Sequence, residues 1–351
     1  MKSGPRPFDV LLAGYYGFGN LGDELLASGA VSLLVRSGIK RERIAILSNR
    51  PDESSRALGI DAFSRGLSSR QMRHALSASK TMLIAGGGIF QDSTSVRSCF
   101  YYWRLVRKAL SHSCKVAAIS QSVGPLSSFF GKMMTRDALL RCAYLSVRDM
   151  ASLNVARGLG LEADLCPDIV MALEIPRLLP AEKGDVLVNI RPVKKTKDID
   201  NVLRAARACL ASGLRVKGIA MSSEDKSLFE KRIACGELPP CEVVLIKSED
   251  DFIAASEGAF AAVGMRLHFG VLSLLRGLKV AMTPYDPKVA AFAEKWDALC
   301  PEFSEGQPDS DIMKLLTKSL FEDKKQPDHD KAAHALESAF NKALSLLLED
   351  G

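Results

Sequence analysis

The stretch FDVLLAGYYGFGNLGDE, residues 8–24, joins an apolar run to a glycine-rich segment that ends in two acids. A buried strand, a turn that glycines permit and the start of a helix are expected in that order. This order is the beginning of a βαβ unit, in which parallel strands alternate with helices. The same alternation continues along most of the chain and determines the predicted fold.

Short β-branched runs alternate with helical patterns in two blocks of similar size, separated by the Pro-rich and charged segment EIPRLLPAEKGD, residues 174–185. We therefore predict an α/β protein with two Rossmann-like domains, residues 1–178 and 179–325, facing each other across a cleft as in the GT-B architecture, and a C-terminal helical tail, residues 326–351. Strands are expected at residues 9–14, 43–48, 81–86, 115–120, 143–147 and 163–166 in the first block, and at 186–192, 214–221, 242–247, 258–264 and 277–284 in the second.

The composition is that of a globular protein, with 47% hydrophobic and 25% charged residues in a chain of 351. The N-terminus has no apolar signal region, and no apolar run approaches the ~20 residues that span a bilayer, so a cytoplasmic protein is expected. The eight cysteines are scattered, without metal-ligand spacing, and no metal site is predicted. A net charge of +6 suits anionic small substrates or an acidic membrane surface, and no basic run indicates nucleic acid.

The segment GFGNLG, residues 17–22, matches the G-x-G-x-x-G fingerprint of dinucleotide-binding turns. However, two tyrosines separate Gly14 from Gly17, so the loop is longer than the fingerprint requires, and the next strand ends without the acid that would bind a ribose. Asp23 and Glu24 also place negative charge in the first turn of the helix, where they would repel a pyrophosphate. We therefore expect no NAD(P) and no other cofactor.

Ligands of parallel sheets bind beyond the carboxyl ends of the strands, so the loops after the strands hold the candidate site residues. In the first domain, Asn20 and Asp23 are candidates to bind a hydroxylated substrate, although Asp23 could instead only cap its helix. The three-glycine turn at residues 86–88 lets backbone approach a ligand, or only turns the chain. Gln121 and Arg148 follow two further strands, and Arg148 could equally form a structural ion pair with its neighbouring aspartate.

In the second domain, Arg266 and His268 directly follow an apolar strand, and Asp286 and Lys288 follow the next one. His268 is the one histidine of five that we place at a strand end. Together the loops of the two domains supply positive charge, one proton-transfer group and one carboxylate. This set suits an anionic small substrate and a hydroxyl nucleophile.

Six motifs of the chain, GYYGFGNLGDE, AGGGIFQDSTS, SQSVGPL, SVRDMAS, MRLHF and YDPKV, occur in the order found in the polysaccharide pyruvyltransferase family. The resemblance extends over roughly residues 8–300 and is strongest to the cell-wall branch that ketal-pyruvylates N-acetylmannosamine. It implies a GT-B-like fold, phosphoenolpyruvate as donor and a 4,6-linked pyruvate ketal as product. The implied acceptor is a lipid-linked disaccharide precursor of a secondary cell-wall polymer, met at the inner face of the cytoplasmic membrane, and such ketals anchor surface-layer proteins. Ser122 replaces the glycine that is usual in the family.

The resemblance and the chemistry of phosphoenolpyruvate together suggest a role for each candidate. An imidazole, with an ordinary pKa of about 6.5, can protonate C3 of the enol, and a carboxylate can accept the proton of the attacking hydroxyl. Guanidinium and ammonium groups are suitable counter-ions for a phosphate and a carboxylate. The predicted roles are His268 and Asp23 as catalytic acid and base, Arg148, Lys288, Arg266, Gly87 and Gly88 as donor-binding residues, and Asn20, Asp92, Gln121 and Asp286 as acceptor-binding residues.

Two other functions stay open on the sequence alone. The first is a nucleotide-sugar glycosyltransferase of the same GT-B architecture, because Glu249, Asp250 and Glu257 have a spacing loosely similar to the E-x₇-E acids of such enzymes. The second is a non-catalytic sugar-binding protein, which we would favour if His268 were buried away from a ligand site.

Overall fold

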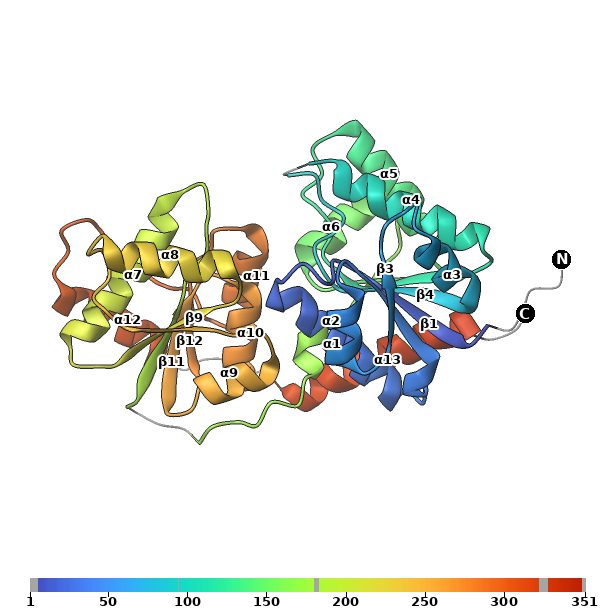
Figure 1. Ribbon diagram of the computed structural model, residues 1–351. Helices are drawn as coiled ribbons and strands as arrows, with labels where there is room; N and C mark the ends of the chain where they lie inside the picture. Colours follow the sequence, from blue (N-terminus) through green and yellow to red (C-terminus); the bar gives the residue numbers. More distant parts are fainter. Residues whose placement is uncertain (1–5, 94, 180–182, 322–327, 349–351) are drawn as a thin grey trace. The chain divides into compact units, whose positions relative to one another are not determined.

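The computed structural model describes residues 6–93, 95–179, 183–321 and 328–348 (Figure 1). The chain divides into two compact units, one formed by residues 1–173 and 330–351 and the other by residues 174–329. The first division falls at residue 173, before the predicted boundary at residue 178. The predicted boundary at residues 325–326 lies outside the described residues.

The first unit is built on a sheet of seven parallel strands in the order β3-β2-β1-β4-β5-β6-β7. Strand order reverses between β1 and β4, which is the topological switch point of a Rossmann-like sheet. All six strands predicted in this block are present, and β3 was missed. The strands are β1 Phe8–Ala13, β2 Ile44–Ser48, β3 Asp61–Ser64, β4 Ser79–Ala85, β5 Lys115–Gln121, β6 Tyr144–Val147 and β7 Asp164–Leu165.

Helices cover both faces of this sheet (Figure 1). Figure 1 shows α4 and α5 above the strands and the red helix α13 below them. The helices are α1 Leu21–Arg36, α2 Pro51–Leu58, α3 Arg70–Ala78, α4 Arg97–Ser111, α5 Phe129–Leu140, α6 Met150–Gly158 and α13 His329–Leu348, with short 3₁₀ turns η1 Arg41–Arg43 and η2 Ile169–Ala172.

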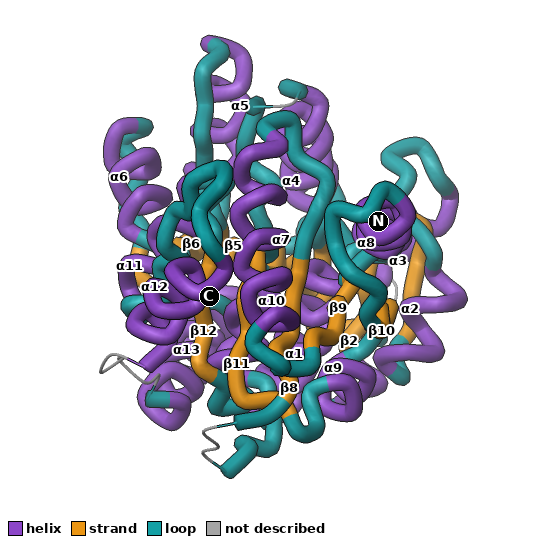
Figure 2. Tube along the Cα trace, turned by 90° about the vertical axis from the view of Figure 1, so that its left-hand side faces the viewer, coloured by secondary structure: helices purple, strands orange, loops and turns teal. Residues whose placement is uncertain are grey.

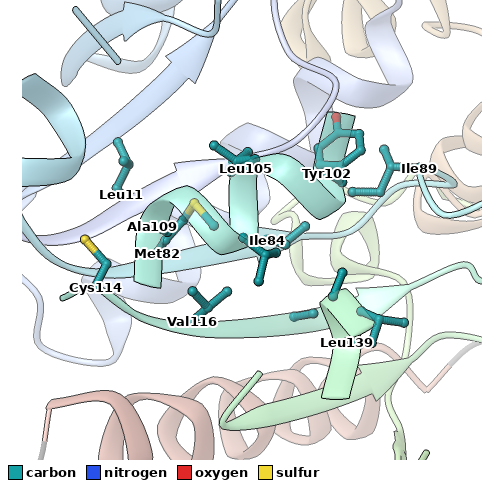
Figure 3. Packing of buried hydrophobic residues seen from close by; sticks show 14 of the residues in the cluster. Leu11, Met82, Ile84, Ile89, Tyr102, Leu105, Ala109, Cys114, Val116 and Leu139 are labelled. Carbon is teal, nitrogen blue, oxygen red and sulfur yellow. The ribbon is translucent and has the colours of Figure 1, made fainter. Parts of the chain in front are cut away.

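The core under α3, α4 and α5 is formed by apolar side chains of the helices and of the strands β1, β4 and β5. Figure 3 shows Leu105 and Tyr102 of α4 above Ile84 and Val116 of the sheet. Burial of this apolar surface is what fixes these three helices on one face. All eight cysteines are free thiols, and five of them are buried, as expected of small apolar residues.

The second unit has a parallel sheet of five strands in the order β10-β9-β8-β11-β12. Every strand predicted in this block is present, and each leads into a helix. Figure 2 shows the strands in orange and the helices in purple. The strands are β8 Asp185–Asn189, β9 Val216–Ala220, β10 Glu242–Leu245, β11 Ala259–Gly264 and β12 Lys279–Met282, and the helices are α7 Thr196–Ala211, α8 Ser223–Ala234, α9 Glu249–Ala255, α10 Leu267–Leu275, α11 Pro287–Lys295 and α12 Asp309–Phe321.

The helix α13 belongs to the first unit, and not to a separate tail. Leu336 and Phe340 on its inner face are fully buried. On its polar side, Lys342 pairs with Asp164 at 2.7 Å and Glu337 pairs with Arg36 of α1 at 3.4 Å. The chain therefore completes the first unit only after it has built the second.

Candidate functional site

The buried side chain of Tyr16 anchors the glycine loop between β1 and α1 to the sheet. Its hydroxyl donates a 2.7 Å hydrogen bond to the carbonyl of Ala85 at the end of β4. Gly17 has φ +79°, and a Cβ there would lie 2.2 Å from Oγ of Ser48 and 2.6 Å from a backbone nitrogen. Both the conformation and the space at Gly17 thus require glycine.

The two acids of the first turn of α1 have different roles. Glu24 accepts a 2.8 Å hydrogen bond from the Gly17 amide, and burial raises the pKa of its carboxyl. This bond occupies the Gly17 amide, which points inward to the Glu24 carboxyl. Asn20, the residue before α1, donates a 2.5 Å hydrogen bond from Nδ2 to Oδ2 of Asp23. The two predicted residues therefore lie together at the carboxyl edge of the first sheet.

The turn after β4 brings Gly87 next to Asp23. Gly86 and Gly87 have φ +66° and +90°, and a Cβ on Gly86 would lie 2.6 Å from Leu26. The position of a Cβ on Gly87 is 4.0 Å from Oδ1 of Asp23, and Gly88 is half-buried. The predicted glycine turn and the predicted base are thus neighbours on one edge.

Gln121 is fully buried, which does not support its predicted contact with the acceptor. Its Nε2 donates to the carbonyls of Ile84, Gly86 and Ile119 at 3.0–3.1 Å. Because these carbonyls belong to the ends of β4 and β5, the amide ties the two strand ends together. Gln121 is a positioning residue under the glycine turn.

The Ser-Gln-Ser segment at the end of β5 has its left-handed residue at Ser120, with φ +54°, and not at Ser122. Two hydrogen bonds hold Ser120 in this conformation: its amide donates to Ser146 Oγ, and its hydroxyl donates to the carbonyl of Pro167. The Ser122 amide donates to the Gly87 carbonyl at 2.9 Å. Ser122 therefore replaces the family's glycine without backbone strain.

Asp92 binds the loop that leads into α5. Its two carboxylate oxygens accept hydrogen bonds from the amides and hydroxyls of Ser127 and Ser128, at 2.5–3.1 Å. Burial opposes ionisation, but these hydrogen bonds outweigh it and lower the pKa of Asp92 to about 2. This network gives Asp92 a structural task, and its predicted contact with an acceptor stays a prediction.

Arg148, after β6, is almost fully buried and is engaged by acids. Its Nη1 donates a 2.6 Å hydrogen bond to Asp168, which caps η2, and Asp149 lies 3.9 Å from its Nε. The structural ion pair that the sequence allowed between Arg148 and the neighbouring Asp149 is thus present, but it is long. Asp168, 20 residues further along the chain, is the closer ion-pair partner. A donor-binding role for Arg148 would require sharing the guanidinium with Asp168.

In the second unit, Arg266 precedes α10 and forms a bidentate ion pair with Asp225 of α8. The two bonds measure 2.6 and 2.7 Å, and Asp225 is fully buried. The Arg266 amide donates to Oδ1 of Asn189 at the end of β8, at 3.0 Å. These contacts fix Arg266 at the carboxyl edge of the five-stranded sheet.

Arg191, after β8, is a functional candidate that the sequence analysis missed. Its Nη1 donates a 2.6 Å hydrogen bond to the hydroxyl of Tyr285, and its guanidinium lies 4.9 Å from the centre of that ring. Its Nε is buried and has no hydrogen-bond partner among the described residues. Burial raises the pKa of Tyr285, so the hydroxyl that Arg191 contacts is neutral. The position of Arg191 directly after a buried strand was the signal that could have identified it.

His268 and Lys288 lie in the first turns of α10 and α11, and both side chains are half-buried. Asp286 caps α11 by accepting a 2.7 Å hydrogen bond from the Lys288 amide. Because β8, β11 and β12 are neighbouring parallel strands, Arg191, Arg266 and these α10 and α11 residues share one sheet edge. That edge combines cationic groups with one imidazole.

The acids of the glycosyltransferase alternative do not meet at this edge. Glu249 begins α9, after the carboxyl end of β10, whereas Glu257 leads into the amino end of β11. Glu257 is also paired with the buried Arg276. The two acids therefore lie at opposite ends of α9, and the spacing does not form a joint ribose site.

Solved structures define the class of fold. The chain is similar to the UDP-GlcNAc 2-epimerases from Methanocaldococcus jannaschii (10% identity, 95% of this chain and 98% of that chain, TM-score 0.61) and from Neisseria meningitidis (10%, 98% and 100%, TM-score 0.57). It is also similar to S. aureus MnaA in complex with UDP (10%, 98% and 99%, TM-score 0.61). The fold is thus the GT-B-like one, with two Rossmann-like units, as the sequence predicted.

A family profile gives the more specific result. The profile of the polysaccharide pyruvyl transferases matches residues 20–287, and the chain belongs to this family. No curated protein matches the chain in sequence. The family confirms the predicted resemblance and makes the protein a pyruvyl transferase that acts on a polysaccharide.

Proposed function

We propose that the protein transfers a pyruvate ketal from phosphoenolpyruvate to the 4- and 6-hydroxyls of an N-acetylmannosamine residue and releases phosphate. The acceptor in this proposal is a lipid-linked precursor of a secondary cell-wall polymer, and the product anchors surface-layer proteins. The observation that supports it best is the gathering of Arg191, Arg266, His268 and Lys288 at one edge of the second sheet, in a chain of this family.

The donor is an anion with two charged groups, a phosphate and a carboxylate. Arg191 offers a guanidinium whose only hydrogen bond in the described structure goes to a neutral phenol. Arg266 already forms a bidentate ion pair with Asp225. Its proposed role is therefore to position this edge of the sheet and to add to the positive electrostatic potential there, and not to bind the donor directly. Arg191 and Lys288 are therefore the proposed donor-binding pair, and Arg148 is a weaker candidate than the sequence suggested.

The proposed chemistry needs one acid and one base. His268 gives a proton to C3 of the enol, which makes C2 electrophilic, and the first sugar hydroxyl adds to C2. Phosphate then leaves, and the second hydroxyl closes the ketal on the oxocarbenium-like centre. Asp23, the proposed base, accepts one hydroxyl proton and passes it to solvent, the other hydroxyl proton leaves with phosphate, and His268 takes up a new proton from solvent. Asn20, which orients Asp23, is the proposed contact for the acceptor.

The lipid-linked acceptor requires contact with a membrane surface. No helix in the described part of the chain combines the length and apolar character that crossing a bilayer requires. The proposed association is therefore peripheral, at the inner face of the cytoplasmic membrane, and it should weaken as salt is raised.

The test is a comparison of donors on one acceptor. The protein is incubated with a β-N-acetylmannosaminide and either phosphoenolpyruvate or UDP-sugars, and the products are analysed by mass spectrometry and a phosphate assay. Phosphate release together with the mass gain of a pyruvate ketal is expected with phosphoenolpyruvate alone. UDP release with a glycosylated product would overturn the proposal in favour of the glycosyltransferase.

A histidine pair provides the matched variants. His268→Ala should lower kcat by roughly 10²–10⁴-fold, the range for a positioned general acid. His334→Ala removes an exposed histidine on α13 and should leave the rate unchanged. A His268→Ala protein that turns over within a few-fold of the parent would rule out His268 as the acid.

A further inference from the structure

One face of the first unit carries a local excess of positive charge. The helices α3, α4 and α5 lie on the same side of the sheet and share one apolar core. They contain eight Lys and Arg residues and a single acid, a net charge of +7, whereas the whole chain has +6. The rest of the molecule is therefore close to neutral, and these three helices, which we call the α3–α5 face, account for the excess.

The same face exposes large apolar side chains. On α5, Phe129 and Phe130 are 75% and 64% exposed, and Met133 and Leu140 are exposed as well. Phe129, Met133 and Leu140 occur at i, i+4 and i+11, so they form one outward stripe along the helix. Phe100 of α4 is also exposed. Side chains of this size are rarely left in water as a group without a partner.

The single acid of the face, Asp137 on α5, is neutralised within it. It accepts hydrogen bonds from Nε1 of Trp103 and Nη1 of Arg107 on α4, at 2.7 and 3.1 Å, and from Arg141 at the end of α5. These bonds lower the pKa of Asp137 to about 2, led by the bond from Arg141. Asp137 thus joins α4 to α5 and leaves the outward side of the face cationic.

A cavity of about 440 Å³ opens on this face between α3 and α4. Arg104 forms no ion pair or hydrogen bond with any described residue, and Lys108 donates to the carbonyl of Leu67 rather than to an acid. No Asp or Glu lines the cavity, so it suits an anionic group. The lining residues are Leu67, Ser68, Arg73, Trp103, Arg104, Arg107, Lys108 and Ser111.

We propose that the α3–α5 face docks the protein on an anionic lipid bilayer. The apolar stripe of α5 lies in the headgroup and acyl boundary, the flanking Lys132 and Arg136 contact lipid phosphates, and the cavity receives one anionic headgroup. The exposed phenylalanines favour a bilayer over a nucleic acid, because a phosphodiester backbone offers no apolar layer to cover them. The inference gives a location to the membrane contact of the proposed function, but vesicle binding is measured independently of pyruvyl transfer.

The first test is co-sedimentation of the full chain with phosphatidylcholine vesicles, with and without phosphatidylglycerol. Binding to the anionic vesicles alone, lost at high salt, is expected. The double variant Phe129→Ser/Phe130→Ser and the double variant Arg104→Glu/Lys132→Glu should each lower the partition coefficient roughly tenfold or more.

Matched controls lie elsewhere on the surface. Leu179→Ser removes a side chain that is 89% exposed, and Lys40→Glu/Arg56→Glu reverses two exposed cations outside the face. Neither should change vesicle binding by more than a few-fold. Equal losses in the controls and in the face variants, or tighter binding to RNA than to anionic vesicles, would overturn the proposal. Activity of every variant on a short soluble acceptor should equal that of the parent, which separates docking from catalysis.

A second test reports which face touches the bilayer. The chain has two tryptophans, Trp103 beside the cavity and Trp296 at the end of α11. In vesicles whose acyl chains are brominated, the fluorescence of the Trp296→Phe variant, which keeps Trp103, should be quenched. The Trp103→Phe variant should stay bright. Quenching of Trp296 alone would place the contact on the second unit and refute the inference.

Discussion

Breaking the ion pair between Asp225 and Arg266 should destabilise the second unit strongly. In Asp225→Asn the guanidinium loses the charge of its bidentate partner, while the Arg266 side chain stays only 13% exposed. Removing one partner of a buried pair costs about 3–5 kcal/mol. The asparagine oxygen can still accept one bond from Arg266 and the bond that Asp225 accepts from the Met221 amide, so we expect the lower end, about 3 kcal/mol.

Each unit contains one tryptophan, so the loss can be assigned to one of them. In a Trp103→Phe background, urea unfolding followed by Trp296 fluorescence reports the second unit. With a slope of about 2 kcal/mol per M, Asp225→Asn should lower the midpoint by about 1.5 M. The double variant Asp225→Asn/Arg266→Met removes both charges and should lose much less.

The matched control is Glu302→Gln, which breaks the exposed pair between Glu302 and Lys197 and should hardly move the midpoint. If Asp225→Asn shifts the midpoint no more than this control, the buried pair does not hold α8 to the edge of the sheet. The same conclusion would follow if the double variant were as unstable as the single one.

Three further perturbations test the site. Arg191→Lys should raise the donor KM roughly tenfold with a smaller effect on kcat, because the planar fork is lost while the charge is kept; an unchanged KM would remove Arg191 from the donor site. Asp92→Asn should cost about 1 kcal/mol near neutral pH, since its carboxylate is partly exposed. The pKa of Asp92 is lowered in the fold, so its contribution is present above pH ~4 and is lost toward pH 2, and the gap between variant and parent in urea titrations should close over that range. Gly17→Ala should destabilise the first unit by about 2 kcal/mol or more, because φ is +79° and Ser48 occupies the space; a neutral effect in Trp103-monitored unfolding would show that the loop can relax.

The sequence predicted the fold because its strands are short continuous apolar runs bounded by glycines, prolines and charges, a pattern that parallel sheets produce. The strand it missed, Asp61–Ser64, begins with an acid, has only four residues and lies half-exposed at the sheet edge, so its pattern is weak. Strand ends also located the candidate site, since the carboxyl edge follows from the βαβ order.

Long-range partners could not be predicted in the same way. Asp168 and Arg148 form an ion pair across 20 residues of sequence, and Asp225 and Arg266 form one across 41 residues. No local sequence pattern predicts either pair. Arg191 was missed because the strand predicted at residues 186–192 extended over it, whereas β8 ends at Asn189. Ser122 stands where the family usually has glycine, but the left-handed residue of this segment lies two residues earlier, at Ser120.

The return of α13 to the first unit has a consequence for synthesis on the ribosome. The second unit is in effect inserted into the first, so its residues leave the exit tunnel and can fold while the sheet of the first unit still lacks its last helix. Until α13 emerges, the apolar surface that Leu336 and Phe340 cover is open to solvent and to chaperones. Chains released before residue 329 should therefore contain a folded second unit and an aggregation-prone first one.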